Sequence, residues 1–209
     1  MINWLKAEWN NLASKYCEDQ EVIDRFWQEL FKAYTGKNRC YHNASHIYNM
    51  LIQAEAIKSK IADFDALCFA IWYHDIVYRS TKNNNEEQSA VFAINCLKSF
   101  AINKKRLEFI SDLIVSTKKH EVLCFQNRDN AYLLDLDLLI LGSDWGTYKV
   151  YCLNIRKEYR MYPSFIYNKG RKKVLTHFLE RESLFFSKHF RSQFEIKARE
   201  NIKKELHLL

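Results

Sequence analysis

The chain has 209 residues, enough for one large domain with a substantial core, and it carries a formal net charge of +7. Its four glycines and one proline are too few for the many tight turns of a β-sandwich, whereas long helices tolerate this composition. The six cysteines include no C-x-x-C pair, which excludes the common cysteine zinc motifs and indicates reduced thiols in a cytoplasmic protein.

Apolar side chains recur at helical spacing along nearly the whole chain. Asp63 and Asp144 each precede an apolar segment that they can cap, and Gly36 and Pro163 follow segments that they can end. The polar run over 79–85 predicts a loop. The pattern therefore predicts an all-α bundle in a single domain. Its expected helices cover about 3–16, 20–35, 44–60, 64–78, 86–100, 104–119, 128–141, 145–161, 165–188 and 191–207.

The positive charge lies in short clusters of lysine and arginine without a helix-turn-helix or an aromatic nucleic-acid motif. We interpret these clusters as solvated helix faces or as an attraction for an anionic substrate, and we expect no nucleic-acid partner. The N-terminal residues lack the apolar core of a signal peptide, and the longest apolar run, over 66–73, is too short to span a bilayer. We therefore expect no membrane partner, and the sequence leaves a homo-oligomer open.

The pair His74-Asp75 ends this apolar run, which predicts a buried helix. An imidazole and a carboxylate are costly to bury unless they are paired or bound to a cation. Because both are ligand types suited to Zn, Mn, Fe and Mg, a divalent metal site would explain the pair. Two residues cannot hold a metal alone, so further ligands are expected elsewhere in the chain.

Two histidines upstream are the first candidates. His42 and His46 are four residues apart, which places them on one face if the segment is helical. Alternatively, Asn43 or Ser45 caps a helix that begins there and leaves His46 in its first turn.

Downstream, Asp135 and Asp137 lie in a run of leucines, where an unpartnered carboxylate would be costly. Residues two apart on a helix point about 200° away from each other, so both cannot easily reach one metal. Between the His-Asp pair and these aspartates stands His120, at the end of an expected helix.

The order of these residues resembles the HD superfamily of metal-dependent phosphohydrolases. Further segments are similar to a bacterial subfamily described as predicted metal-dependent HD phosphohydrolases. The resemblance implies one HD-type helical domain over 1–209, with its core motifs in about 39–205 and packing helices in 1–38. The similar segments are Tyr41-His42-Asn43, His46-Ile47, Trp72-Tyr73-His74-Asp75, Asn85-Glu86-Glu87-Gln88-Ser89-Ala90, Asp135-Leu136-Asp137-Leu138, Arg156-Lys157-Glu158-Tyr159, Gly170-Arg171 and 195–201.

The resemblance implies a divalent metal (Mn, Fe, Co, Ni, Zn or Mg) held by four residues. In the family pattern the last aspartate precedes leucines, which favours Asp137, with Asp135 as the alternative. His120 would be either an outer ligand to a second metal or an exposed histidine at a helix end. The implied ligands are His46, His74, Asp75 and Asp137.

Other residues are candidates for catalysis and substrate binding. Asp75 could orient the attacking hydroxide, and the family motif places Glu86, rather than Glu87, as a general acid or base. The alternative for Glu86 is a favourable charge at a helix N-terminus. Guanidinium groups bind phosphate oxygens bidentately. The substrate-binding candidates are His42, Arg39, Arg156 and Arg171.

We therefore expect an enzyme, a metal-dependent hydrolase of a phosphoester or phosphoanhydride, whose partner is a small phosphorylated substrate such as a nucleotide. One alternative is a non-catalytic HD protein that binds a nucleotide and regulates a partner. Another is an oxidative di-iron enzyme, which would need about six ligands. The intact ligand set favours the hydrolase, because a binding module does not need an open metal site.

Overall fold

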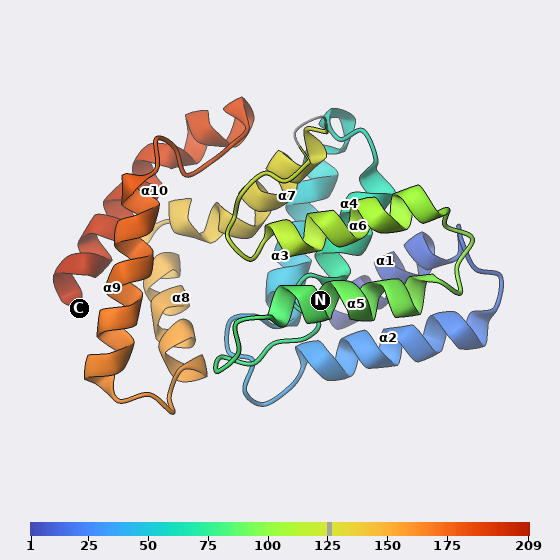
Figure 1. The fold of residues 1–209 in the computed structure, drawn as a ribbon, viewed down its shortest axis with the longest axis horizontal. Coiled ribbons are helices and arrows are strands. Elements are labelled where there is room, and N and C mark those ends of the chain that lie inside the picture. The colour runs from blue at the N-terminus through green and yellow to red at the C-terminus, as the bar shows by residue number, and fades with distance from the viewer. Residues whose placement is uncertain (125–126) are drawn as a thin grey trace.

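The apolar run that precedes His74-Asp75 forms the central helix of the protein, α4 (Phe64–Tyr73) (Figure 1). In the computed structural model, which describes residues 1–124 and 127–209, every residue from 66 to 73 is buried. A helix that is apolar on all sides must be covered on all sides. The helices that pack around α4 are α3 (Ala44–Ala56), α5 (Asn85–Leu97), α6 (Lys104–Ser116) and α7 (Asp129–Leu138).

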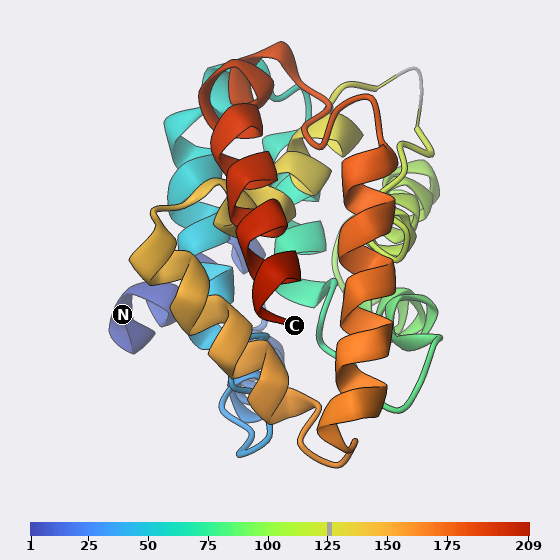
Figure 2. The same ribbon diagram turned by 90° about the vertical axis from the view of Figure 1, so that its left-hand side faces the viewer.

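The prediction of an all-α fold is confirmed, since residues 1–124 and 127–209 contain helices and no strand. The three C-terminal helices, α8 (Trp145–Glu158), α9 (Ser164–Glu180) and α10 (Lys188–Leu208), form a second layer at one end of the bundle (Figures 1 and 2). The start of α3 and the end of α7 lie at this end of the bundle. The remaining helices are α1 (Ile2–Ala13) and α2 (Gln20–Tyr34), with short 3-10 turns η1 (Lys58–Lys60) and η2 (Leu139–Gly142).

The two N-terminal helices pack against α4, as expected of packing helices. Trp9 of α1 is fully buried, and its ring meets those of Phe69 and Trp72 edge to face. Tyr34 of α2 donates a hydrogen bond from its hydroxyl to the carbonyl of Trp72, at 2.9 Å. An aromatic core of this kind buries a large area per residue and fixes α1 and α2 against α4.

The expected helix over 64–78 is too long, because α4 ends at Tyr73. Arg39 explains the early end: its guanidinium donates to the carbonyls of Asp75 and Ile76. In a continued helix these two carbonyls would accept from backbone amides four residues later. His74 and Asp75 therefore lie at the end of the helix and in the turn that follows it.

The expected helix over 165–188 is also too long, because α9 ends at Glu180. Arg199 of α10 donates to the carbonyls of Leu179, Arg181 and Glu182, which satisfies groups that a helix end leaves without partners. The predicted caps are confirmed, because the side chains of Asp63 and Asp144 accept from backbone amides in the first turns of α4 and α8. No helix in the described part of the chain combines the length and the apolar character needed to cross a membrane.

Candidate metal centre

Three helix ends bring two imidazoles and two carboxylates together inside the protein. Asn43 caps α3, as one of the two alternatives predicted, and this leaves His46 in the first turn. His74 and Asp75 follow α4, and Asp137 lies in the last turn of α7. The side chains of His46 and His74 are only 5% and 1% exposed, so the two imidazoles are almost fully buried.

The donor atoms of these side chains converge on one point. His46 Nε2 lies 3.2 Å from His74 Nε2 and 3.2 Å from Asp137 Oδ1. Asp75 Oδ2 lies 3.2 Å from His74 Nε2 and 3.9 Å from His46 Nε2. His46, His74 and Asp75 thus form a group that could hold a metal ion. We name the four residues His46, His74, Asp75 and Asp137 the His-Asp cluster.

The hydrogen bonds of His74 favour a cation at this point. Its Nδ1 lies 2.9 Å from the carbonyl of Ile71, so a neutral ring donates there and turns the lone pair of Nε2 into the cluster. Two Nε2 lone pairs that face each other at 3.2 Å need a proton or a metal ion between them. A set of imidazole and carboxylate donors suits Zn, Mn or Fe, so these residues fit the expected metal.

Charge within the cluster shifts the pKa values of its members in opposite directions. Burial lowers the pKa of His74, but the nearby carboxylates of Asp75 and Asp137 outweigh burial and raise it to about 9. Burial raises the pKa of Asp75 and Asp137, and the surrounding imidazoles outweigh it and hold both well below their usual range. The two aspartates are therefore carboxylates at neutral pH, the form that binds a metal.

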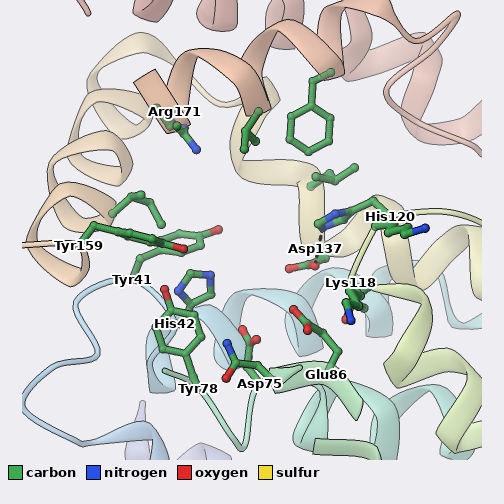
Figure 3. A pocket seen from close by; sticks show the side chains of 18 of the residues that line it. Tyr41, His42, Asp75, Tyr78, Glu86, Lys118, His120, Asp137, Tyr159 and Arg171 are labelled. Carbon is green, nitrogen blue, oxygen red and sulfur yellow. Dashed lines mark hydrogen bonds and ion pairs between the residues drawn. The ribbon is translucent and has the colours of Figure 1, made fainter. Parts of the chain in front are cut away.

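The structure separates the two aspartates of α7. Asp137 faces the His-Asp cluster, and its second oxygen, Oδ2, lies 3.0 Å from Nε2 of His120 (Figure 3). Asp135 points elsewhere: it is fully buried and accepts from the backbone amides of Phe186 and Ser187, just before α10. Asp137 therefore connects the cluster to His120, and Asp135 holds the start of α10.

His120 has an unusual backbone conformation, because its φ of 48° is one that residues other than glycine rarely adopt. Its carbonyl accepts a hydrogen bond from Arg181, which helps to hold this conformation. Such local strain is typical of functional sites. The backbone directs the imidazole of His120 towards Asp137, so His120 is not a free surface histidine at a helix end.

His42 lies beside the cluster and is held by a carboxylate that the sequence reasoning missed. Glu158, at the end of α8, accepts from the backbone amides of Tyr41 and His42, and its Oε2 lies 2.7 Å from Nδ1 of His42. The hydroxyl of Tyr78 also donates to Glu158, at 2.9 Å. Glu158 lies 116 residues from His42 along the chain, and only its place in the motif 156–159 marked it. Burial lowers the pKa of His42, but Asp75 and Glu158 outweigh it and raise that pKa.

A cavity of about 1100 Å³ opens between the cluster and the C-terminal helices. Asp75 and Asp137 lie at its floor, and Arg171 of α9 and Tyr159 after α8 lie on the opposite wall (Figure 3). Glu86 points into it from the first turn of α5, and burial raises the pKa of Glu86. Other polar side chains that line the cavity are Lys82, Asn83, Lys118, Lys119, Glu121, Lys173, His177 and Arg181.

Glu86 and Glu87 have different surroundings, although both lie in the first turn of α5. Glu87 forms an ion pair with Lys118, whereas Glu86 lines the cavity. Of these two glutamates, only Glu86 therefore has its side chain in the lining of the cavity.

The three candidate arginines are not equivalent. Arg39 donates to the carbonyls of His42, Asp75 and Ile76, and Arg156 donates to those of Tyr159 and Tyr162. Both guanidinium groups thus hold turns of the backbone, and neither is among the described residues that line the cavity. Arg171 does line the cavity, but its guanidinium forms a buried bidentate pair with Glu205. These contacts favour a structural role over phosphate binding for all three arginines.

No protein-family model matches this chain, and no curated protein matches it with significance. The geometry of the site is a largely buried cluster of two imidazoles and two carboxylates at the floor of a large cavity.

Proposed function

We propose that the protein is a metal-dependent phosphohydrolase of the HD type that acts on a small phosphoester or phosphoanhydride. The observation that carries this proposal is the convergence of His46, His74, Asp75 and Asp137 at the floor of an open cavity. A divalent ion held by these residues would polarise a phosphoryl oxygen and lower the pKa of a water molecule towards neutrality.

Lysines on the cavity wall support an anionic substrate. Lys119, Lys173 and Lys82 line the cavity from three different segments of the chain, and they add positive charge around its wall. Positive side chains around a concave site raise the local concentration of an anion and speed its association. They would draw the phosphate towards the floor, where the cluster lies.

Glu86 is the residue that we assign to proton transfer. Its carboxylate points into the cavity, on the same side as Asp75 and Asp137 (Figure 3). Burial raises its pKa, which favours a carboxyl group able to take up and release a proton nearer to neutral pH. Asp75 would accept a hydrogen bond from the attacking water and so orient it.

Phosphate release from a panel of nucleotides, sugar phosphates and pyrophosphate, each with Mn, Co, Ni, Zn or Mg, tests the proposal. Glu86→Gln should lower kcat by about 10²- to 10⁴-fold, the usual range for a lost general acid or base. Glu87→Gln is the matched control, because that carboxylate pairs with Lys118, and its effect should be much smaller. Tight binding of a nucleotide without turnover under every metal would instead favour a regulatory protein.

A further inference from the structure

Gly170 is a glycine inside a helix without a packing reason. It lies in the middle of α9, where glycine lowers helix stability relative to alanine. Gly142 shows the usual reason for a glycine: a Cβ there would lie 2.7 Å from Cβ of Phe194. A Cβ at Gly170 would meet no atom of the described residues within 4 Å. Gly170 lines the cavity, so its missing side chain leaves open space in the cavity wall.

Apolar residues on either side of Gly170 share this wall with the charged side chains of Arg171 and Lys173. Ile166 lies four residues before Gly170, and Val174 and Phe178 lie four and eight residues after it. This spacing places the four residues along one face of α9, and all of them line the cavity. Ile166 and Val174 are each 47% exposed, so about half of each apolar side chain remains accessible to a ligand. We name Ile166, Gly170, Val174 and Phe178 the α9 stripe.

Tyrosines supply the neighbouring wall. Tyr159 and Tyr162 line the cavity after the end of α8, with ring centroids 6.1 Å apart, and Tyr41 and Tyr151 line it nearby. Flat aromatic rings and a helix face without a side chain together suit a flat apolar group, because such a group can lie against the backbone. The His-Asp cluster, at the floor of the same cavity, provides the charged end of the site.

We propose that the α9 stripe binds a planar ring carried by the substrate, so that the preferred substrate is a phosphoester of a ring-bearing alcohol such as a nucleoside 5′-monophosphate. The phosphate would lie at the His-Asp cluster and the ring against Gly170. The orientation of the phosphate rests on the proposed function, whereas the binding of the ring rests on the α9 stripe and the tyrosines.

A matched pair of substrates tests this ring-binding surface. Nucleoside 5′-monophosphates and ribose 5-phosphate present the same kind of phosphate ester, but only the nucleotides carry a base. For at least one base, kcat/KM should exceed that of ribose 5-phosphate by about 10-fold or more, the discrimination expected from burying a ring-sized apolar group. Equal values for the nucleotides and ribose 5-phosphate would overturn the proposal.

Gly170→Leu places a side chain in the open space and should remove most of this preference. We expect KM to rise about 10-fold or more for the nucleotide and to change little for ribose 5-phosphate. Lys172→Leu introduces the same side chain at an exposed position of α9 outside the cavity lining, so it should keep the preference. Circular dichroism of both variants should match the wild type, because the added Cβ meets open space at position 170.

Calorimetric titration with the same nucleotides separates this inference from the proposed function. If a nucleotide binds, Gly170→Leu weakens it and no phosphate is released, the ring-binding surface stands and the hydrolase proposal fails. If phosphate is released equally from all substrates, the hydrolase stands and the ring-binding surface fails. If the nucleotides neither bind nor react, the ring-binding surface is overturned.

Discussion

Asp135 and Asp137 stand two residues apart on α7 and serve different parts of the molecule. The sequence already predicted that they point in different directions, since the helical repeat turns them about 200° apart. The preference for Asp137 came from a family pattern, and the structure places that residue 3.2 Å from His46. The partner of Asp135 could not be predicted, because the amides of Phe186 and Ser187 lie about fifty residues away, before a different helix.

Substitution of Asp137 and of Asp135 should therefore have different effects. Asp137→Asn should weaken metal binding by more than about 100-fold, because it removes a charged ligand, and loss of a residue that only supports a ligand already costs about 10- to 100-fold. Asp135→Asn should lower the free energy of unfolding by about 1–3 kcal/mol, because it weakens hydrogen bonds to buried amides. Calorimetric metal titration and urea unfolding of both variants measure the two effects. The reverse pattern would assign the metal to Asp135.

The role of an arginine is difficult to predict from its position in the sequence. Arg39 was a candidate for binding phosphate, yet its guanidinium holds the carbonyls of Asp75 and Ile76 and so shapes the turn that carries the cluster. An arginine has the same donors for a phosphate and for a carbonyl, so its sequence position alone does not distinguish the two. The role of Glu158 could not be predicted for a different reason: its partner His42 lies 116 residues away along the chain.

At the scale of elements, a buried ion pair joins α9 to α10, in addition to the contacts of Arg199. Arg171 donates to both oxygens of Glu205, which also accepts from the hydroxyl of Tyr148. Burial raises the pKa of Glu205, but the hydrogen bonds and charge of Arg171 outweigh it and lower that pKa below its usual 4.5. The pair thus holds one wall of the cavity against the C-terminal helix.

The lowered pKa of Glu205 predicts that the stability contributed by this ion pair depends on pH. A carboxyl whose folded pKa lies below its unfolded value adds stability above the unfolded pKa and loses it as pH falls through the folded pKa. Near neutral pH, Glu205→Gln should lower the free energy of unfolding by about 3–5 kcal/mol, since it leaves Arg171 buried without a counter-ion. The difference from the wild type should shrink as pH falls below about 4.5. Urea unfolding of both proteins across this range checks it, and a constant difference would contradict it.

A second element contact depends on Gly142, where η2 lies against α10. A Cβ at this position would lie 2.7 Å from Cβ and 3.1 Å from the backbone oxygen of Phe194. Gly142→Ala should therefore lower the free energy of unfolding by about 1–3 kcal/mol, because packed groups must move apart. Gly170→Ala is the control and should instead stabilise α9, by up to about 1 kcal/mol. Thermal unfolding of the two variants measures the opposite signs, and equal shifts would contradict the packing argument.

Element types followed from the sequence more readily than element ends. The 3.6-residue spacing of apolar side chains predicted the helices, and Asp63, Asp144 and Asn43 marked starts that local hydrogen bonds then confirm. The ends of α4 and α9 were predicted too late. Arg39 and Arg199 end them by taking backbone carbonyls, and these contacts join distant parts of the chain.

At the scale of the whole molecule, the candidate site lies between two layers. The bundle of α1 to α7 carries the His-Asp cluster, and α8 to α10 form a layer at one end of it (Figures 1 and 2). A cavity of about 1100 Å³ lies between the cluster and this layer. Residues that the sequence singled out at 46, 74, 75 and 137 do converge. The cavity and its tyrosine wall were not predicted, because a cavity is defined by how layers pack and leaves no periodic pattern in a sequence.

The central claim is that the His-Asp cluster binds a metal ion, and elemental analysis of the purified protein tests it most directly. We predict about one divalent transition-metal ion per chain in the wild type, lost in the double variant His74→Ala, Asp75→Ala. The single variant Asp75→Asn is closest in shape to the wild type, so loss of metal in this variant is not explained by misfolding. His207→Ala removes an exposed imidazole outside the cluster and serves as the control. Near-stoichiometric metal in the wild type and the control, with little in either cluster variant, is the predicted result. Equal metal in all four proteins, or none in the wild type after metal loading, would contradict the account.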